Sequence, residues 1–396
     1  MIFARINGIN MHLRVSGAAD GRAVVLSNSL GTDARIWNAV IERLSDRYRV
    51  ISYDQRGHGL SDAPSAPYRL DDHVADLEGL ADFLGLAEFA LAGVSVGGLI
   101  AMGFALRNAH RLKALILCDT AARIGDDATW NNRIAAIRAN GIASISDAIM
   151  ARWFGPQFRA EHAADYAGWR NMLERSPVEG YIGTCAALRD ADLRGQVGSI
   201  GLRTLVVVGE HDQSTPPEVV RATAELLPDA RFEIVAGVGH IPSIEQPERL
   251  VELMLNYFRE VGYVREPEYR QGMVTRRSVL GDAHVDGALA RQTEFDADFQ
   301  TFITETAWGD LWSRPGISRR ERSMLTIALL AALGHDEEVA MHVRATTNTG
   351  ASPADIREAL MHVAVYAGVP AANRAFRIAR DELAKTGRLT REESGA

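Results

Sequence analysis

Short apolar runs alternate with segments of helical periodicity over the first two thirds of the chain. Six of these runs are rich in β-branched or small apolar residues and end near Gly, Asp or Asn: AVVLSN, RVISYD, FALAGV, KALILCD, RTLVVVGE and RFEIVAG. Such runs are typical of buried parallel strands joined by crossover helices. The pattern therefore predicts an α/β domain over residues 1–262, with a mostly parallel sheet.

Two segments depart from this alternation. Between residues 122 and 195 no strand-like run occurs, and aromatic side chains are frequent, which predicts a helical insertion that serves as a lid. Residues 263–275, YVREPEYRQGMVT, are polar, contain Pro and Gly and keep no sustained period. We expect this second segment to be a linker between two domains.

After the linker only helical patterns follow, so residues 276–396 are predicted to form a smaller all-α domain. Ser318 begins a capping box with Glu321, and the helix that it starts ends at Gly334. Ser352, followed by a proline, begins another helix. Further helical patterns make roughly five helices in all, with the others at 287–308, 336–349 and 371–386.

Composition narrows the class of protein. The chain has 396 residues, more than one hydrophobic core usually serves, and with 47% hydrophobic and 24% charged residues it is typical of a globular protein. A net charge of −8 without a basic run argues against non-specific nucleic-acid binding. The start of the chain does not resemble a signal peptide, and the longest apolar stretch is too short to span a bilayer. We therefore expect a cytoplasmic protein that does not bind membranes.

The two cysteines, Cys118 and Cys185, limit the chemistry further. They form no CxxC motif, and two cysteines in so long a chain make no disulfide framework and no metal quartet. We predict that both are buried and act as small hydrophobic side chains.

One serine lies between glycines directly after a strand-like run. The sequence Gly93-Val94-Ser95-Val96-Gly97 follows FALA and precedes a helical run, the context in which GxSxG places a nucleophilic serine on a sharp turn. The glycines permit this turn because they carry no Cβ. The same string also occurs as an ordinary glycine turn, so the assignment of Ser95 as a nucleophile depends on finding its base and acid.

Both partners follow in the expected order, the acid before the histidine. A serine hydroxyl needs a base, and the base needs an acid that orients it and stabilises the imidazolium. Asp212 follows the run RTLVVVGE, and His240 lies in a glycine-rich loop after the next run. Asp119 is a rival acid, but we favour Asp212 because its strand directly precedes that of His240. His211 and His58 are poorer candidates for the base.

An ester hydrolase also needs N–H donors for the oxyanion of its tetrahedral intermediate. The backbone N–H of Val96, just after the candidate nucleophile, is one expected donor. The loop SNSLGTD should supply the other, and we predict the N–H of Leu30. Loss of one such donor costs about 2.7 to 4 kcal/mol of transition-state stabilisation.

Residues 1–262 resemble the α/β-hydrolase superfamily. DQRGHGLS and GVGHIPSIEQPE are typical of the superfamily, and SNSLGTDARIW with GVSVGGLIAMGFAL is similar to the 3-oxoadipate enol-lactonases in particular. Most members of the superfamily have His-Gly in the oxyanion loop. This chain has Asn28 and Ser29 there instead, which is similar to the enol-lactonases. The resemblance implies an α/β-hydrolase fold and a Ser-His-Asp triad that hydrolyses a lactone.

The lactone implied by this resemblance carries a carboxylate. The lid should therefore present a cation to it. Arg133 and Trp130 are the candidate substrate contacts, with Trp153 as a wall of the site.

Residues 276–396 resemble the carboxymuconolactone decarboxylase family, an all-helical fold shared with alkylhydroperoxidase D. The matching stretches are TAWGDLWSRPGISRRERSMLTIALLAALG, EEVAMHVRATTNTGASPADIREAL and HVAVYAGVPAANRAF. The peroxidase branch uses a CxxC pair, and this half has no cysteine, so thiol peroxidase chemistry is excluded. The resemblance implies a decarboxylase without a cofactor, because the lactone carbonyl of the substrate can accept the electrons that leaving CO₂ releases.

Four residues of this half are candidates for that chemistry. Glu338 and His342 lie four apart on a predicted helix and share a face, which by pattern alone is also typical of an exposed ion pair. The resemblance assigns the acid role to His342, because it falls at the histidine of the family's helix motif. Arg322 could hold a carboxylate, and for Glu321 the alternative to a role in the chemistry is that it serves only as the helix cap. The Glu338–His342 spacing differs from Glu-x-x-His, so we expect no metal.

Together the two resemblances imply consecutive reactions of the β-ketoadipate route of aromatic catabolism. Decarboxylation of 4-carboxymuconolactone would yield 3-oxoadipate enol-lactone, which the first domain would hydrolyse to 3-oxoadipate. The partners expected are small anionic lactones, and by resemblance the helical half would form a homo-oligomer. The alternative is a general esterase whose helical domain only mediates oligomerisation.

Overall fold

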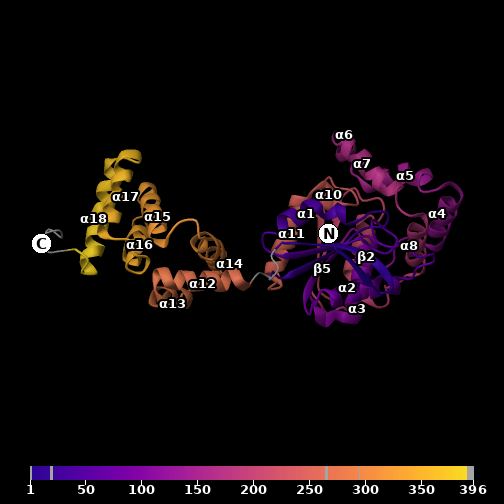
Figure 1. The fold of residues 1–396 in the computed structure, drawn as a ribbon, viewed down its shortest axis with the longest axis horizontal. Helices are drawn as coiled ribbons and strands as arrows, with labels where there is room; N and C mark the ends of the chain where they lie inside the picture. Colours follow the sequence, from indigo (N-terminus) through magenta and orange to yellow (C-terminus); the bar gives the residue numbers. More distant parts are fainter. Residues whose placement is uncertain (1, 18–20, 264–265, 294, 390–396) are drawn as a thin grey trace. The chain divides into compact units, whose positions relative to one another are not determined.

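The computed structural model describes residues 2–17, 21–263, 266–293 and 295–389. It divides the chain into two compact units, Met1–Val264 and Arg265–Ala396, drawn in Figure 1. The first unit holds all the strands of the described residues, and the second is built from helices. This confirms the predicted order of an α/β domain followed by an all-α domain.

The first unit is built on an eight-stranded sheet with the order β1-β2-β4-β3-β5-β6-β7-β8. All six predicted strands are present, and the pairs from β4 through to β8 are parallel. Every residue of β3, β5 and β7 is buried, as continuous apolar runs predict. The six strands are β3 (Ala23–Ser27), β4 (Arg49–Tyr53), β5 (Phe89–Val94), β6 (Leu112–Cys118), β7 (Thr204–Gly209) and β8 (Ala230–Val235).

Two further strands at the start of the chain were not predicted. β1 (Ile2–Ile6) pairs with β2 (Ile9–Ser16), and β2 pairs with β4, both antiparallel. Asn7 and Gly8 join β1 to β2, and both have positive φ angles, 44° and 79°. An Asn-Gly pair between alternating apolar residues is a strong hairpin signal, so the sequence did contain the evidence for these strands.

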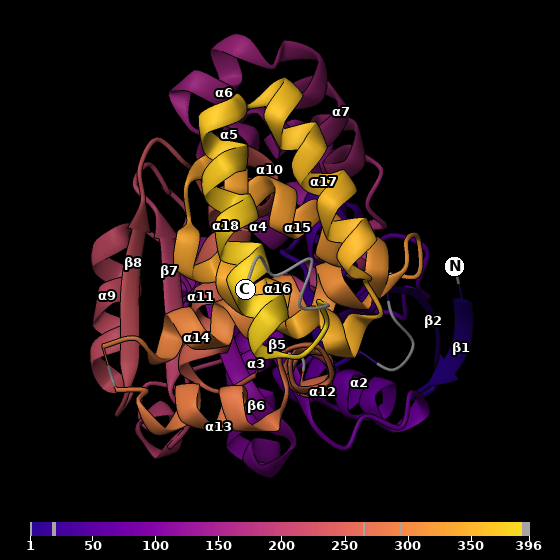
Figure 2. The same cartoon turned by 90° about the vertical axis from the view of Figure 1, so that its left-hand side faces the viewer.

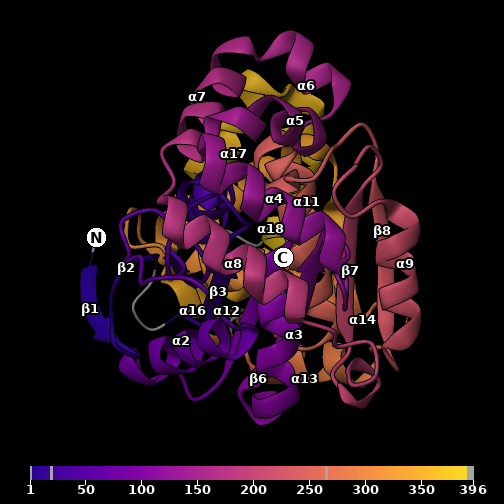
Figure 3. The ribbon, with the colours of Figure 1, turned by 90° about the vertical axis from the view of Figure 1, so that its right-hand side faces the viewer.

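Helices cover the sheet (Figure 3), and one of them follows the candidate nucleophile directly. Helix α3 begins at the end of β5 and contacts β3, β5 and β6, while α1 contacts α11. The main covering helices are α1 (Asn38–Leu44), α2 (Leu70–Phe83), α3 (Val96–Asn108), α9 (Pro217–Leu226) and α11 (Pro247–Glu260). Cys118 and Cys185 are both fully buried and lie in the core of this unit, as expected.

The expected lid lies between β6 and β7 in the sequence and consists of helices, without a strand among its described residues. The bounds are α4 (Asp127–Asn140), α5 (Ala143–Trp153), α6 (Pro156–Glu161), α7 (Ala163–Glu174) and α8 (Val178–Asp190). Helices α5, α6 and α7 lie together, away from the strands, in Figures 1 and 3. Phe154 contributes to this grouping, since its ring stacks on Phe158 at 4.6 Å and meets the edge of Tyr166 at 5.7 Å.

The second unit, which faces the viewer in Figure 2, is helical throughout its described elements. Two expectations were wrong here. Residues 266–275, expected to be linker, belong to α12, and the stretch 287–308 is divided by a break into several short helices. The elements are α12 (Glu266–Leu280), α13 (Asp282–Ala290), α14 (Ala297–Ile303), the π-helix η4 (Thr304–Asp310), the 3₁₀ turn η5 (Leu311–Ser313), α15 (Arg319–Leu333), α16 (Asp336–Thr349), α17 (Pro353–Tyr366) and α18 (Val369–Lys385).

The helix caps predicted for this unit are confirmed. Ser318 accepts a hydrogen bond from the N–H of Glu321, whose carboxylate accepts one from the N–H of Ser318. Gly334 ends the helix in the left-handed conformation. The same reciprocal cap, with Ser352 and Asp355, begins α17. Helices α15 to α18 pack together around one small apolar core.

Candidate functional site

Ser95 occupies the turn between β5 and α3. Its backbone has φ 58° and ψ −121°, a conformation that is unusual for a residue with a side chain. A Cβ on Gly93 would lie 2.2 Å from the carbonyl oxygen of Gly97, and a Cβ on Gly97 would lie 2.4 Å from that of Ser27. The two glycines of GxSxG are therefore required by close backbone contacts, which hold Ser95 on a strained turn.

His240 and Asp212 lie in loops that follow neighbouring strands, β8 and β7. The Nδ1 atom of His240 is 2.8 Å from Oδ2 of Asp212, and both side chains are buried. The N–H of His240 donates to the carbonyl of Trp153 over 2.7 Å, which fixes the histidine loop to the end of α5. Within the described residues Ser95 and His240 are not hydrogen bonded to each other, but both side chains line the same cavity.

The carboxylate of Asp212 accepts several hydrogen bonds. It accepts hydrogen bonds from the N–H groups of Ser214 and Thr215 and from the hydroxyl of Thr215, at 2.7, 3.1 and 2.7 Å. Burial alone would raise the pKa of Asp212, but the charge of His240 and the hydrogen bonds from His240 and Thr215 together lower it. Asp212 is thus held as a carboxylate beside the imidazole. Thr215 was not singled out from the sequence.

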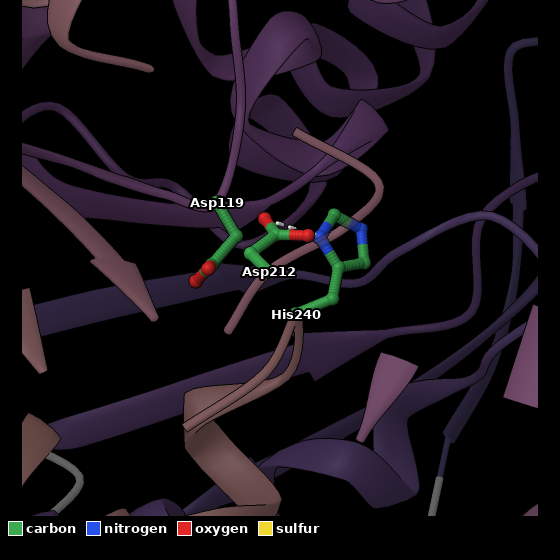
Figure 4. Close-up of side chains that lie close together, drawn as sticks. All are labelled: Asp119, Asp212 and His240. Atoms are coloured by element: carbon green, nitrogen blue, oxygen red, sulfur yellow. Dashed lines mark hydrogen bonds and ion pairs between the residues drawn. The ribbon is translucent and has the colours of Figure 1, made fainter. Parts of the chain in front are cut away.

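Asp119, the rival acid, lies behind Asp212 and not against the imidazole (Figure 4). It is fully buried at the end of β6, and its Oδ1 accepts a hydrogen bond of 2.8 Å from the N–H of Gly209. Burial and the charge of Asp212 raise the pKa of Asp119 well above its usual value. The preference for Asp212 as the partner of His240 agrees with this geometry.

These three side chains are also the one group among the described residues whose ligand atoms are close enough to share a metal ion, all within 4.8 Å of one another. However, Nδ1 of His240 and Oδ2 of Asp212 are 2.8 Å apart, and two ligands of one tetrahedral Zn²⁺ lie roughly 3.3 Å apart. The pair has the spacing of a hydrogen bond. The residues therefore do not fit a zinc site.

A cavity of about 80 Å³ lies at Ser95 and His240. Since one water needs roughly 10 to 15 Å³, this space admits a compact ligand. Of the described residues that line it none is acidic, and two are arginines. The lining includes the three predicted substrate contacts of this unit, Trp130, Arg133 and Trp153, and one of the two predicted oxyanion donors, Leu30, but not Val96.

The second arginine of the cavity, Arg152, was missed. It immediately precedes Trp153 in the sequence, so the expectation of a cation near that wall residue could have identified it. Arg133 lies over the ring of Trp130, with its guanidinium carbon 4.8 Å from the ring centroid. The Trp130 indole N–H donates to the carbonyl of Ile124 over 2.6 Å, which fixes the surface on which Arg133 rests.

The two predicted oxyanion donors occupy suitable backbone positions. Leu30 lines the cavity from a turn in which the N–H of Thr32 donates to the carbonyl of Ser29, and the side chain of Asn28 donates to the carbonyl of Thr32. Val96 is the first residue of α3, so its N–H has no partner within the helix. A helix N-terminus also favours negative charge nearby.

Glu245 is a further polar group near the site that the sequence did not reveal. Its two carboxylate oxygens accept hydrogen bonds of 2.8 Å from the N–H of Gly155, at the start of α6, and from the N–H of Gly239, next to His240. Burial raises the pKa of Glu245 to about 7, although these two hydrogen bonds act in the opposite direction. One carboxyl thus connects the lid to the histidine loop.

In the second unit, His342 lies on α16 and packs against two tryptophans, Trp308 and Trp312, whose own rings lie 5.3 Å apart. Its ring is nearly parallel to those of Trp308 and Trp312, with centroids 6.4 and 6.0 Å away. The side chain is buried, and its Nδ1 has no hydrogen-bond partner in the described residues. Burial and the nearby His284 lower the pKa of His342 to about 4, so the imidazole is neutral at pH 7.

The other candidates of this unit are arranged less simply. Glu338 is exposed and makes no hydrogen bond with His342; only its charge acts on the imidazole. Arg322 is buried, and its guanidinium donates to the backbone carbonyl of Arg314 over 2.8 Å. Glu321 serves as a cap. The tertiary neighbours of His342, Trp308 and Trp312, could not be assigned from spacing.

Comparison with known proteins agrees with both halves of the chain. The profile of the alpha/beta hydrolase fold family matches residues 22–247, more than half of the chain, and that of the carboxymuconolactone decarboxylase family matches residues 297–381. The chain belongs to both families. It is an enzyme formed by fusion of an α/β hydrolase and a carboxymuconolactone decarboxylase-family domain, as the two resemblances predicted.

Individual relatives divide in the same way. The α/β-hydrolase part is 34% identical over 232 residues to 3-oxoadipate enol-lactonase 2 of Acinetobacter baylyi, covering 59% of this chain and 86% of the relative. The decarboxylase-family part is 45% identical over 116 residues to 4-carboxymuconolactone decarboxylase of the same organism, covering 29% and 87%. The solved enol-lactonase of Burkholderia xenovorans LB400 is 34% identical, with a TM-score of 0.64 over 65% of this chain and 100% of that structure. In the described residues no helix combines the length and the apolarity that crossing a bilayer demands.

Proposed function

We propose that the fusion enzyme catalyses two consecutive steps, decarboxylation of 4-carboxymuconolactone and hydrolysis of the resulting 3-oxoadipate enol-lactone. The observation that carries the hydrolytic half is the cavity that exposes Ser95 and His240 together, with Asp212 hydrogen bonded behind the imidazole. The relatives of both parts support the pairing of substrates, because the product of one named relative is the substrate of the other.

In the hydrolytic step the Ser95 hydroxyl attacks the lactone carbonyl, and His240 accepts the hydroxyl proton through Nε2. Asp212 stabilises the imidazolium that forms. The N–H groups of Leu30 and Val96 hold the oxyanion until the ring C–O bond breaks, and the imidazolium gives its proton to the leaving enol oxygen. Water then attacks the acyl-enzyme with His240 again as the base, which releases 3-oxoadipate and restores Ser95.

The charges of the cavity suit a substrate that bears a carboxylate. Arg133 and Arg152 are its two cations, and no acidic side chain is present among its described lining residues to neutralise them. Trp130 and Trp153 provide apolar walls for the lactone ring. We assign the substrate carboxylate to these arginines, because a guanidinium can bind a carboxylate through two parallel hydrogen bonds.

The decarboxylation needs no cofactor in this scheme. The C–C bond to the carboxylate breaks, CO₂ leaves, and the electron pair passes through the ring alkene into the lactone carbonyl to give a dienolate. Because His342 is neutral at pH 7, we propose that its ring N–H donates a hydrogen bond to the dienolate and gives this proton to the ring carbon, while its other ring nitrogen takes a proton from water and leaves hydroxide, which CO₂ can consume as bicarbonate. Arg322 would hold a substrate carboxylate, and Glu338 would act on His342 through its charge.

We further propose that the second unit self-associates. Leu325, Leu329 and Leu333 lie four residues apart on α15, and their exposed fractions are 56, 63 and 70%. Such an apolar stripe on one helix face favours contact with another protein surface. Leu329→Glu should therefore reduce the mass measured by light scattering, whereas Glu358→Gln, an exposed change on α17, should not. An unchanged mass in Leu329→Glu would exclude this face.

The most direct test supplies purified enzyme with 4-carboxymuconolactone and follows both products. CO₂ and 3-oxoadipate should appear in equal amounts, with enol-lactone as a transient intermediate. Enzyme that hydrolyses simple esters but releases no CO₂ would support the alternative, a general esterase with a non-catalytic helical domain.

A further inference from the structure

A second carboxyl group lies directly behind the His240–Asp212 pair. Asp119 is fully buried, and one of its oxygens, one of Asp212 and a ring nitrogen of His240 lie within 4.8 Å of one another. Figure 4 shows the carboxyl of Asp212 between the imidazole on one side and Asp119 on the other. Asp119 also has a positive φ of 48°, so the chain holds it in an uncommon backbone conformation.

The two oxygens of Asp119 have very different surroundings. Oδ1 accepts the hydrogen bond from the N–H of Gly209, whereas Oδ2 is buried and has no partner among the described residues unless it carries a proton. No described Lys or Arg forms an ion pair with Asp119. The ionisable groups that face it are Asp212, His240 and Glu245, together with its chain neighbour Cys118.

Two buried carboxyl groups this close cannot both be ionised, because nothing separates the two negative charges. Asp212 is the better place for the charge, since it receives three donors from Ser214 and Thr215 as well as the ring N–H of His240. Asp119 has only one donor, from Gly209. The proton therefore belongs on Asp119, which agrees with the raised pKa of Asp119 and the lowered pKa of Asp212.

We propose that Asp119 is held as a neutral carboxylic acid whose Oδ2–H donates to Asp212, and that it is a positioning residue for His240. This hydrogen bond would fix the carboxylate of Asp212 and withdraw part of its negative charge from the imidazole. The inference rests on the hydrolytic mechanism proposed above, but the protonation of Asp119 can be measured without any substrate.

The protonation state of Asp119 can be measured from the infrared C=O stretch of the full-length enzyme. Near pH 8.5 Glu245, with its pKa of about 7, is ionised, so a remaining carboxylic-acid band should come from Asp119. The band should be present in the wild-type enzyme and absent in Asp119→Asn. If no such band exists, Asp119 is ionised and the proposal is overturned, whatever substrate the enzyme uses.

The positioning role is read from the pH profile of kcat/KM for 3-oxoadipate enol-lactone. Asp119→Leu removes the donor, so kcat/KM should fall roughly 10- to 100-fold and the acidic limb should move to higher pH, because the full negative charge of Asp212 then acts on the imidazolium. Asp119→Asn still offers an N–H to Asp212, so it should restore most of the loss and leave the limb in place.

Three results would contradict this role. A limb that moves to lower pH in Asp119→Asn would show that a charge on Asp119 had been acting on His240. A profile of unchanged shape in Asp119→Leu, as expected for the matched cavity variant Val207→Ala on β7, would leave Asp119 with only a packing role. A stoichiometric metal ion bound by the wild-type enzyme and lost in Asp119→Asn would replace the proton as the occupant of this cluster.

Discussion

The two units of the chain differ in how each one holds its candidate catalytic histidine. Around His240 and Asp212 every hydrogen bond needed to orient the imidazole comes from the same unit, and one large apolar core supports them. In the second unit the buried His342 leaves Nδ1 without a partner among the described residues, and the apolar core is divided into two small clusters. A stripe of leucines on α15 is also exposed.

This difference separates two ways of building a site. The hydrolase-like site uses loops at the end of a sheet, whose core is large enough to hold them rigidly in one chain. The helical unit has two small apolar clusters and leaves the leucines of α15 exposed, so part of its apolar surface is available to a second protein surface. We therefore expect the first site to tolerate dilution of the protein, and the second to depend on self-association.

The strongest way to sharpen the comparison is to disable the first site alone. Ser95→Ala removes the proposed nucleophile and should lower hydrolysis of the enol-lactone by roughly 10⁴- to 10⁶-fold, while CO₂ release continues. The enol-lactone should then accumulate, as measured by chromatography of the products. Ser144→Ala, on the exposed surface of the lid, is the control. Hydrolysis that persists in Ser95→Ala would exclude the serine mechanism.

The reciprocal change tests the second site. His342→Gln removes the imidazole that packs against Trp308 and Trp312 and should slow CO₂ release by roughly 10²-fold or more, whereas hydrolysis of supplied enol-lactone should not change. The matched control is His362→Gln, since His362 is exposed and its ring stacks on that of Tyr366, with centroids 6.1 Å apart. Equal rates of decarboxylation in both variants would remove His342 from the mechanism.

The charge of the first cavity predicts a smaller, selective effect. Arg152→Met and Arg133→Met should each lower kcat/KM for the carboxylate-bearing lactone by roughly 10- to 100-fold, mainly through KM, because a charge-assisted hydrogen bond is lost. A neutral ester of similar size should be hydrolysed as before. Arg138→Met on α4 controls for a general loss of positive charge. Equal losses on the charged and neutral substrates would contradict carboxylate recognition.

A change at Glu245 should have the smallest effect on activity. It tests how the stability of the first unit depends on pH. Its pKa is about 7 in the folded chain and about 4.3 in an unfolded one, so the folded state binds the proton more tightly. The free energy of unfolding should therefore fall as pH rises from about 4.3 to about 7, by roughly 3 to 4 kcal/mol in total, of which roughly 2 to 3 kcal/mol falls between pH 5 and pH 8. Urea unfolding from pH 5 to pH 8 should show this slope in the wild type and lose it in Glu245→Gln. Retention of the slope there, or its loss in the exposed control Glu252→Gln, would contradict this assignment.

The sequence revealed those features that depend on local pattern. The six predicted strands, the glycines around Ser95 and the chain order of Asp212 and His240 all follow from runs, turns and spacing. The hairpin of β1 and β2 was overlooked although Asn7-Gly8 signals it. The start of α12 was mistaken for a linker, because its polar residues and glycine hide the helical period.

Features that depend on tertiary contact could not be predicted in this way. The position of Asp119 behind Asp212 depends on the pairing of neighbouring strands. Arg152 lines the cavity only because the lid helix that carries it, α5, folds over the site. The lowered pKa of His342 results from its burial and from His284, and Trp308 and Trp312, about thirty residues away in the sequence, pack against its ring. Spacing predicted that Glu338 and His342 share a helix face, but it could not supply the chemical surroundings of either side chain.

The burial of both cysteines has a practical consequence. Cys118 and Cys185 are the only thiols of the chain, and both lie in the first unit with no exposed surface. Burial also raises the pKa of Cys185 to about 12, so little reactive thiolate exists in the native state. A thiol-reactive dye should therefore label the protein only when this unit opens. The rate at which the dye is incorporated would therefore report the rate of opening of the first unit. It would not report unfolding or association of the second unit.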